Sequence, residues 1–374
     1  MHIAFLIRCL SPGGAERAAT ALANQMTRCG HKVTILCLTG TDCFYETDPE
    51  INIRYLNSDP AELTAGIRRL TDLLQRSRTI RKAVREIGPD VLVGMSWMMS
   101  VYAVFSTCGT PVASIGTERS NPFILNKSRV NSFLRQFAAK HCDGFVCQTE
   151  KARSFFSSAA QRKIRIIPNG IFNPEVFNTP VPYEREKIIT ALGRLDDNKG
   201  YDVLIRAFAL VRARRPDYTL CIFGDGEKRD DLLSLAASLG VADAVRLPGT
   251  DKSAIRKIAA SSVFVLSPRS EGMPNALIEA MAVGVPCVST RCDMGPEELI
   301  RDGVNGLLVP VDDPDSMAKA ILRVLDDPQL QTDLSHAAVA IRSTHAVEPV
   351  TDRWLRLFDE VRSAKCGKAR NYKK

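Results

Sequence analysis

Short runs of apolar and β-branched residues alternate along the whole chain with segments whose apolar residues recur at helical spacing. In the first half the apolar runs are residues 2–7, 33–38, 91–95, 111–115, 143–147 and 165–167. A second series follows at 187–192, 219–223, 244–247, 263–266, 286–290 and 307–309. Strands that alternate with helices are typical of parallel sheets covered by helices. The pattern predicts an α/β protein with two such sheets, one after the other.

The two series of predicted strands are separated by residues 172–186. The residues that interrupt any periodic pattern there are Pro174, Pro180 and Pro182. We therefore expect an N-terminal domain over 1–180 and a C-terminal domain over 181–348. A last helix is predicted over 349–363, and the apolar residues along one side of it are Val350, Trp354, Leu357 and Val361. We expect this helix to pack back on the first domain.

Length and composition agree with two globular domains. At 374 residues the chain exceeds what one hydrophobic core usually spans, and its 45% hydrophobic and 25% charged residues are ordinary for globular proteins. No stretch approaches the roughly 20 uncharged apolar residues of a membrane span, and the run 2–7 is too short for a signal peptide. The 11 cysteines lack the paired close spacing of a zinc site, which favours a reducing, cytosolic setting. We expect neither a disulfide nor a metal ion.

The net charge of +8 is unevenly distributed, because basic residues concentrate in 66–87 and in 365–374. This excess indicates an anionic partner or surface. The apolar residues of 66–87 recur at roughly helical spacing, so we expect an amphipathic helix with an arginine-rich face. Two interpretations stay open. The helix could lie against anionic lipid or meet a lipid-linked pyrophosphate, or it could be an ordinary domain helix with a charged outer face.

Two glycines, Gly13 and Gly14, lie between the first predicted strand and a helix whose first turn contains Glu16 and Arg17. Glycines at this position let backbone N–H groups approach a phosphate at the helix N-terminus. The alternative is a tight turn of the kind found in any α/β protein. The G-x-G-x-x-G fingerprint of dinucleotide-binding dehydrogenases is missing here, which weighs against that class.

The second predicted domain opens with a loop, 193–200, directly after its first strand. Arg194 offers a planar fork of donors and Lys199 a mobile positive charge, so together they could neutralise a diphosphate. The alternative is two solvated surface cations. Further turns follow the next two strands, where Gly224 and Asp225 could approach a ring or ribose, and Arg246 and Leu247 could present backbone groups to a nucleobase.

The most informative segment, 267–281, runs from the end of a predicted strand into a helix over 274–283. Glu271 lies in the loop and Glu279 two turns further on, so both can face one pocket. Carboxylates suit sugar and ribose hydroxyls. The backbone around Gly272, Met273, Pro274 and Asn275 could hold phosphate or sugar oxygens at the helix N-terminus. The alternative is a helix-dipole carboxylate and one solvated glutamate.

At these residues the chain resembles the family-four retaining glycosyltransferases of the GT-B fold. The resemblance covers nearly the whole length. It rests on the segments 13–17, 30–34, 167–170, 193–195, 199–200 and 224–226, and above all on the paired glutamates Glu271 and Glu279. It implies two Rossmann-like α/β domains with parallel sheets that face each other across a cleft.

The resemblance also implies roles for individual residues. Arg194 and Lys199 would clamp the donor diphosphate, Glu271 would hold the transferred sugar and Glu279 the ribose hydroxyls. The catalytic residues would be Arg194, Lys199 and Glu271, because the charge that develops on the leaving diphosphate has to be stabilised. The other donor-binding residues would be Gly13, Gly14, Gly224, Asp225, Arg246, Leu247, Gly272, Met273, Pro274, Asn275 and Glu279.

One position departs from the family pattern. Many members have a histidine in the loop after the strand that corresponds to 111–115, whereas this chain has Arg119 there. An arginine cannot act as a base at neutral pH, so its role becomes acceptor or phosphate binding, with Glu118 as its polar partner. The residues predicted to contact acceptor or phosphate are Glu16, Arg17, Glu118 and Arg119.

These observations lead to a functional hypothesis. The chain would transfer a hexose or N-acetylhexosamine from a UDP-sugar, with retention and without a metal ion, to a growing glycan linked to polyprenyl diphosphate in cell-surface polysaccharide biosynthesis. Its expected partners are the nucleotide-sugar, a lipid-linked or oligosaccharide acceptor and an anionic membrane surface, with no nucleic acid. We expect it in the cytoplasm, peripheral on the inner face of the plasma membrane.

Two other classes of protein stay open. A UDP-sugar 2-epimerase shares the architecture, and turnover of UDP-sugar without an acceptor would reveal it. A non-catalytic nucleotide- or glycan-binding module would bind the donor without transferring its sugar to any lipid-linked acceptor.

Overall fold

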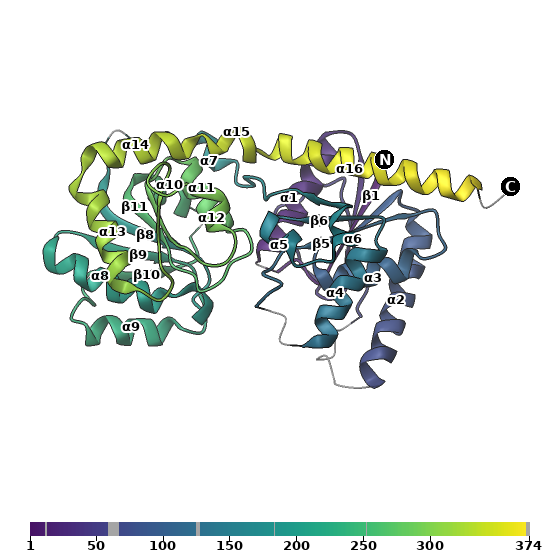
Figure 1. Cartoon of the computed structure of the whole chain (residues 1–374), viewed down its shortest axis with the longest axis horizontal. Helices are drawn as coiled ribbons and strands as arrows, with labels where there is room; N and C mark the ends of the chain where they lie inside the picture. The colour runs from purple at the N-terminus through teal and green to yellow at the C-terminus, as the bar shows by residue number, and fades with distance from the viewer. Residues whose placement is uncertain (12, 59–66, 125–127, 183, 252, 372–374) are drawn as a thin grey trace. The chain divides into compact units, whose positions relative to one another are not determined.

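The computed structural model describes residues 1–11, 13–58, 67–124, 128–182, 184–251 and 253–371, with the backbone alone at 67–70 and 366–371. These residues form two compact units (Figure 1). The first consists of Met1–Phe172 with Val347–Lys374, and the second of Asn173–Ala346. Each unit has its own sheet and its own hydrophobic core.

A seven-stranded parallel sheet forms the centre of the first unit, with the order β3-β2-β1-β4-β5-β6-β7. Its strands are β1 (His2–Ile7), β2 (Lys32–Cys37), β3 (Asn52–Tyr55), β4 (Val91–Gly94), β5 (Ala113–Glu118), β6 (Gly144–Cys147) and β7 (Ile164–Ile166). The order reverses at β1, and ligands of such sheets bind at the carboxyl ends of the strands beside this switch point. Strand β3 was not predicted from the sequence, because none of its residues is fully buried and no apolar run marks it.

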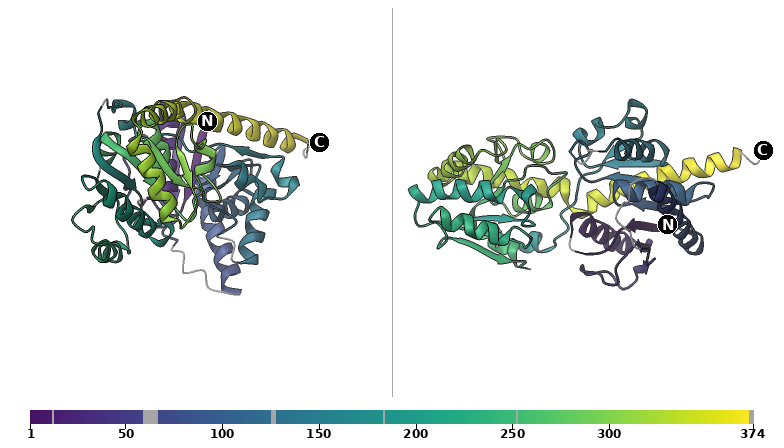
Figure 2. Two further views of the ribbon diagram at one scale, coloured as in Figure 1. Left: turned by 60° about the vertical axis from the view of Figure 1, so that its left-hand side comes forward. Right: turned by 90° about the horizontal axis from the view of Figure 1, so that it is seen from below.

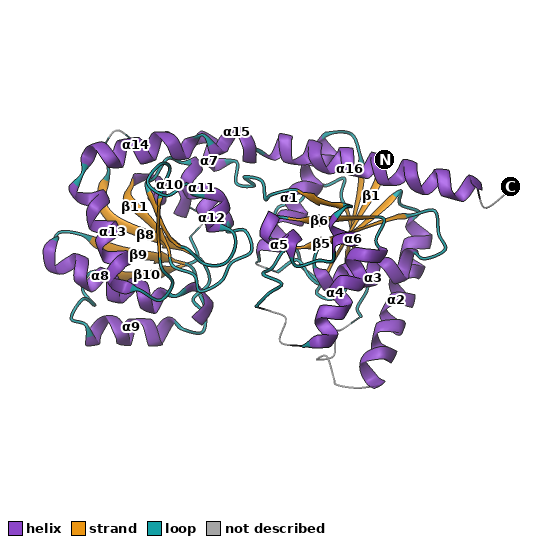
Figure 3. Cartoon of the chain, viewed as in Figure 1, coloured by secondary structure: helices purple, strands orange, loops and turns teal. Residues whose placement is uncertain are grey.

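Helices cover both faces of this sheet (Figures 2 and 3). They are α1 (Gly14–Arg28), α2 (Ile67–Ile87), α3 (Trp97–Thr107), α4 (Arg129–His141), α5 (Glu150–Ser154), α6 (Ser158–Gln161) and α16 (Val347–Asn371). Along β1, Phe5 packs with α1 and α16, whereas Leu6 packs with α2 and α3. Successive strand residues point to opposite faces, so an uninterrupted apolar strand supplies both cores.

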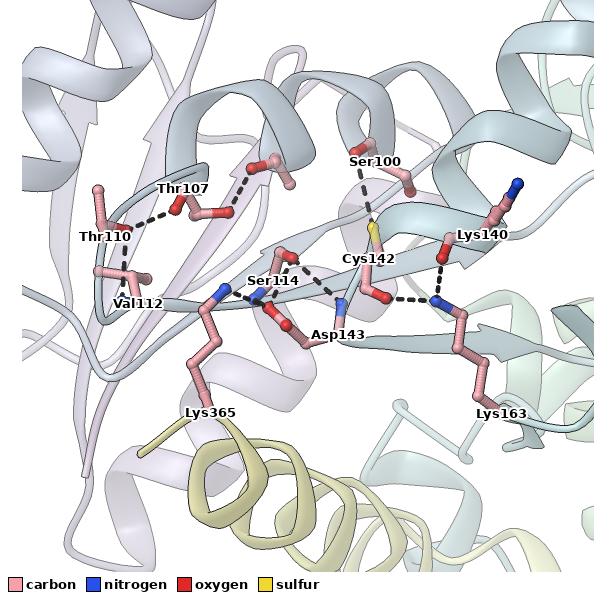
Figure 4. A network of polar contacts seen from close by, with 11 residues as sticks. Ser100, Thr107, Thr110, Val112, Ser114, Lys140, Cys142, Asp143, Lys163 and Lys365 are labelled. Atoms are coloured by element: carbon pink, nitrogen blue, oxygen red, sulfur yellow. Dashed lines mark hydrogen bonds and ion pairs between the residues drawn. The ribbon is translucent and has the colours of Figure 1, made fainter. Parts of the chain in front are cut away.

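The last helix, α16, lies on the first unit although it follows the whole second unit in sequence. The side chains that it buries there are Val350, Trp354, Leu357, Phe358 and Val361. A Cβ on Gly144 of β6 would lie 2.9 Å from Val361 Cγ1, so this glycine lets the helix approach the sheet. Further along, Lys365 forms an ion pair of 2.7 Å with Asp143, whose carboxylate also accepts hydrogen bonds from Ser114 (Figure 4).

Helix α2 contains most of the basic segment 66–87. Its apolar side packs into the core, with Ile80 and Val84 buried and Ile87 partly buried. Even one arginine, Arg76, is buried and donates to Tyr102 Oη at 3.2 Å. This part of the predicted apolar stripe therefore packs into the domain itself, whereas Leu74 stays 42% exposed. Within the part of the chain that the structure describes, none of the helices combines the length and apolar character needed to cross a membrane.

The second unit contains a six-stranded parallel sheet with the order β10-β9-β8-β11-β12-β13. Its strands are β8 (Glu186–Leu192), β9 (Thr219–Phe223), β10 (Val245–Gly249), β11 (Ser261–Leu266), β12 (Cys287–Thr290) and β13 (Leu307–Val309). Its helices are α7 (Glu175–Asn178), η1 (Asp197–Lys199), α8 (Tyr201–Arg214), α9 (Arg229–Ser238), α10 (Ala254–Ala260), α11 (Asn275–Ala282), α12 (Pro296–Leu299), α13 (Pro314–Asp326), α14 (Pro328–Val339) and α15 (Ile341–His345). The order reverses at β8, so β8, β9 and β11 flank the switch point.

Candidate functional site

The loops that follow β8 and β9 are joined backbone to backbone at the switch point of the second sheet. Gly193 N–H donates to Phe223 O at 3.0 Å, and Leu195 N–H donates to Asp225 O at 3.0 Å. The second loop is held in turn by β10, because Gly224 N–H donates to Gly249 O at 2.8 Å. This part of the site is a rigid backbone framework.

Two glycines make this framework possible. Gly224 has a φ of +128°, and a Cβ there would lie 2.0 Å from Gly193 O. Gly200 has a φ of +60°, and its Cβ would lie 2.2 Å from Ser267 O. Both backbones approach more closely than any side chain allows, and both angles disfavour L-residues with a Cβ. Gly200 and Gly224 are therefore required by packing, whatever this region binds.

Lys199 and Glu271 form an ion pair between the loop after β8 and the loop after β11. The two loops are tied together beneath it, since Arg269 N–H donates to Asn198 O at 2.8 Å and Ser267 Oγ donates to Lys199 O at 2.8 Å. The Lys199 and Glu271 side chains keep 21% and 13% of their exposure, so both remain accessible to a ligand. The fold thus brings together two of the three predicted catalytic residues.

Arg194 is placed differently from the other two. Its side chain is 77% exposed and pairs with Asp196 at 3.2 Å. An exposed pair of this kind contributes little to stability and is easily exchanged for another anion. In this structure Arg194 is an exposed surface cation on the same loop as Lys199.

The second glutamate of the predicted pair, Glu279, is buried inside α11. Pro274 precedes the helix in an extended conformation, and Asn275 is its first residue. Met273 is buried, and a Cβ on Gly295 would lie 2.7 Å from Gly272 O, so a second loop presses on this turn. The segment Gly272 to Asn275 is therefore shaped by close packing at the helix N-terminus.

The remaining predicted donor-binding residues lie in the loop after β9 and on β10. Asp225 is exposed and accepts from its neighbour Gly226 N–H at 2.9 Å. Arg246 is exposed on β10, whereas Leu247 is buried. The Leu247 carbonyl accepts from Arg229 at 2.5 Å, so this oxygen is already engaged within the protein.

In the first unit, polar residues gather where β5, β6 and β7 end. Arg119 donates to Asn169 Oδ1 at 2.5 Å, and Gln148 donates to the same oxygen. Burial lowers the pKa of Arg119 to about 10, and the nearby Glu16 carboxylate acts in the opposite direction. Sequence reasoning assigned no role to Gln148 or Asn169. Asn169 does lie in 167–170, one of the segments on which the family resemblance rests, and no other feature of the sequence pointed to it.

The glycine turn after β1 carries Glu16 at the edge of this cluster. The backbone N–H of Gly13 and the hydroxyl of Tyr45 lie 2.9 Å apart, and the same hydroxyl contacts Gly13 O at 2.9 Å. A Cβ on Gly13 would lie 2.2 Å from a Glu16 carboxylate oxygen, so the carboxylate folds over the glycine. Gly14 begins α1, and Arg17 N–H closes its first turn on Gly13 O at 3.0 Å.

Glu118 is not the polar partner of Arg119, which corrects the sequence interpretation. Its carboxylate is buried and forms an ion pair of 2.5 Å with the equally buried Arg135 of α4. Ser120 donates a further hydrogen bond from its hydroxyl at 2.6 Å. Burial raises the pKa of Glu118, although Arg135 and Ser120 both favour the charged form. The pair anchors α4 beneath the loop that carries Arg119.

Comparisons with known proteins agree with this architecture. Residues 173–340 match the family model "Glycosyl transferases group 1", and residues 12–172 match "Glycosyltransferase Family 4". The lipopolysaccharide core biosynthesis glycosyltransferase LpsE of Rhizobium meliloti is 34% identical over 358 residues, covering 92% of this chain and 96% of that protein. The chain therefore belongs to the family-four glycosyltransferases and is a glycosyltransferase. This confirms the family that the sequence motifs indicated.

Two further relatives are informative. The GalNAc-α-(1→4)-GalNAc-α-(1→3)-diNAcBac-PP-undecaprenol α-1,4-N-acetyl-D-galactosaminyltransferase of Campylobacter jejuni is 27% identical over 97% of this chain and 100% of its own length. The structure of Anabaena Alr3699/HepE in complex with UDP-glucose superimposes with a TM-score of 0.77 at 19% identity, covering 97% of this chain and all of that one. The predicted GT-B fold class is confirmed.

The first prediction concerns the glycine framework. Gly224→Ala should lower the free energy of unfolding by about 3 kcal/mol or more, because the new Cβ meets Gly193 O and φ is positive. Gly240→Ala is the matched control, since φ is +71° but nothing lies within 4 Å, and it should cost only about 1–2 kcal/mol. Scanning calorimetry measures both. Equal losses would contradict a steric requirement at Gly224.

The second prediction concerns the buried pair. Arg135→Met should lower the free energy of unfolding by about 3–5 kcal/mol, because it leaves the Glu118 carboxylate buried without its cation. The double variant with Glu118→Gln should recover most of this loss. Both tryptophans, Trp97 and Trp354, belong to the first unit, so urea unfolding followed by their fluorescence reports on that unit alone. A single variant as stable as the wild type would refute the role assigned to the pair.

Proposed function

We propose that this glycosyltransferase moves a hexose or N-acetylhexosamine, with retention, from a UDP-sugar to a growing glycan linked to polyprenyl diphosphate. The observation that carries the proposal is the accessible Lys199–Glu271 pair at the switch point of the second sheet. A cation and a carboxylate held side by side match the two ends of a sugar diphosphate, the anionic phosphates and the sugar hydroxyls. The UDP-glucose complex of HepE supports a UDP-linked donor, and the undecaprenol-linked substrate of the Campylobacter relative supports a lipid-linked acceptor.

The chemistry asked of these residues is electrostatic. When the bond between the sugar and the diphosphate breaks, negative charge grows on the leaving diphosphate. Lys199 would leave Glu271 and stabilise that charge, and the exposed Arg194 would exchange Asp196 for the phosphates. Glu271 would then hold the sugar, and the leaving phosphate would help to take the proton of the acceptor. We propose that Lys199 and Arg194 stabilise the charge on the leaving diphosphate without a metal ion.

The other predicted roles stay proposals of the same kind. Glu279 would bind the ribose hydroxyls, and the turn from Gly272 to Asn275 would hold sugar or phosphate oxygens. In the first unit, the cluster of Glu16, Arg119 and Asn169 at the carboxyl ends of the strands would bind acceptor or phosphate. Because Glu118 forms an ion pair with Arg135, it would affect ligand binding only by positioning Arg119.

We also propose that the chain is peripheral on the cytoplasmic face of the plasma membrane and that α4 makes the contact. The apolar side chains exposed on α4 and just before it, here called the α4 face, are Phe123, Ile124, Val130 and Phe133. Phe133 is 66% exposed and stacks on Phe137 one turn along. The exposed Arg129 and Lys140 flank it, and residues 119–142 contain no aspartate or glutamate. Aromatic and basic residues on one helix face suit an anionic lipid surface.

The third prediction tests the donor site. Lys199→Ala should lower the rate of sugar transfer to an undecaprenyl-diphosphate-linked acceptor by about a hundredfold or more, because the leaving diphosphate loses a cation. Lys187→Ala is the matched control, since Lys187 forms an ion pair with Asp217 at 2.7 Å at the opposite end of β8 and should leave the rate unchanged. The assay uses a panel of UDP-hexoses and UDP-N-acetylhexosamines and follows radiolabelled glycolipid.

The same assay separates the alternatives. UDP-sugar epimerised at C2 in the absence of acceptor would replace the transferase by an epimerase. Thermal stabilisation by a UDP-sugar without transfer to any lipid-linked acceptor would indicate a binding module. A Glu271→Ala variant that responds to nucleotide sugars as the wild type does would refute the sugar-binding role of Glu271.

The fourth prediction tests the α4 face. The wild type should float with vesicles that contain phosphatidylglycerol and much less with pure phosphatidylcholine vesicles. Phe133→Ser should weaken the partitioning about tenfold, because a largely exposed aromatic side chain no longer enters the lipid interface. Leu210→Ser, which replaces an exposed leucine on α8, is the control and should partition as the wild type does. Equal partitioning of the Phe133 variant would remove the α4 face from the proposal.

A further inference from the structure

A buried hydroxyl without a hydrogen-bond partner lies beside the Lys199–Glu271 pair. Tyr201 begins α8, directly after the left-handed Gly200, and is only 2% exposed. Among the residues that the structure describes, nothing hydrogen-bonds to its Oη. A buried hydroxyl in this state costs free energy that a phenylalanine would not, because the ring alone fills the same space. The apolar core therefore does not explain why the hydroxyl is present.

The hydroxyl points from the core toward the candidate site. The Tyr201 ring belongs to the apolar core of the second unit. A Cβ on Gly193 would lie 2.7 Å from Tyr201 Oη and 3.5 Å from Lys199 Cε, so the hydroxyl and the lysine lie over the same glycine. After burial, the carboxylates of Glu271 and Asp196 are the causes that raise the pKa of Tyr201. The hydroxyl stays protonated and is available as a donor near both carboxylates.

The charge on Glu271 explains what such a donor could do. In this structure the Glu271 carboxylate is neutralised by Lys199. In the proposed function Lys199 turns to the donor diphosphate, which would leave a partly buried carboxylate without its cation. An uncompensated carboxylate of this kind is costly, and a hydrogen bond from a neighbouring hydroxyl reduces that cost and keeps the carboxylate ionised.

We propose that Tyr201 is a positioning residue whose hydroxyl hydrogen-bonds to Glu271 when Lys199 engages the donor diphosphate. This inference rests on the proposed function. It goes beyond it in naming what holds Glu271 during the reaction. Tyr201 itself touches neither the sugar nor the phosphates.

The fifth prediction is that Tyr201→Phe separates stability from activity. The variant should melt at the same temperature as the wild type or higher, because it loses an unpaired buried hydroxyl. Its affinity for UDP, measured by calorimetry, should be unchanged. In the presence of the undecaprenyl-diphosphate-linked acceptor, its kcat for release of UDP from the UDP-hexose or UDP-N-acetylhexosamine that the wild type uses best should fall about tenfold or more, as for loss of a hydrogen bond to a charged group.

The pH profile identifies the group on which the hydroxyl acts. A hydroxyl that donates to a carboxylate favours its ionised form, so loss of that hydroxyl favours the protonated form. The acidic limb of the kcat profile of Tyr201→Phe should therefore move to higher pH. Tyr218→Phe, which removes the hydroxyl of another buried tyrosine in the same unit, is the control and should keep the wild-type kcat and profile.

The outcomes distinguish this inference from the proposed function. A wild type that releases no UDP from any of the sugars overturns the proposed function. A wild type that does, together with a Tyr201→Phe variant of equal kcat and pH profile, overturns the inference alone. A variant that loses thermal stability and UDP affinity together would make the hydroxyl a structural group and would also overturn it.

Discussion

The candidate donor site depends on a backbone contact that only glycine permits. At the carboxyl ends of β8 and β9, Gly224 packs directly on the carbonyl of Gly193. The same device recurs where Gly200 meets Ser267, and together these contacts draw the loops after β8, β9 and β11 into one framework. Lys199 and Glu271 lie 72 positions apart in sequence, and this framework is what makes them an ion pair. The ion pair between Lys199 and Glu271 thus depends on close backbone packing of the loops that carry them.

In the first unit, the loop after β5 that carries Arg119 is held in place by a buried ion pair. Glu118 and Arg135 compensate each other inside the protein, and Ser120 satisfies a further lone pair. Removing either partner would leave the other charge buried and uncompensated, so the loop and α4 hold each other in place. Arg119, next in sequence, is left to face Asn169, Gln148 and Glu16. Two neighbouring residues therefore have different surroundings: Glu118 pairs with Arg135 of α4, and Arg119 contacts the polar cluster that we propose as a binding site.

Helices α2 and α4 show how burial changes the meaning of a basic segment. Both carry arginines and apolar residues. In the structure α2 packs Ile80 and Val84 into the core, while α4 keeps Val130 and Phe133 exposed between Arg129 and Lys140. An amphipathic pattern records that a helix has an apolar face, but the packing of its neighbours determines whether that face meets protein or another surface.

The sequence by itself determined the α/β class and the two successive sheets, and it predicted the residues of the candidate donor site. Apolar runs, glycines and helix-start residues act locally, so their spacing predicts strands, turns and helices without coordinates. Strand β3 was not predicted because none of its side chains is fully buried. Only the tertiary structure decided which side chains meet. It paired Glu118 with Arg135, joined Arg119 to Asn169, buried Ile80 and Val84 of α2 and placed the hydroxyl of Tyr201 with Lys199 over Gly193. These outcomes depend on distances between residues far apart in the chain and on which groups lose water, and neither is written in local pattern.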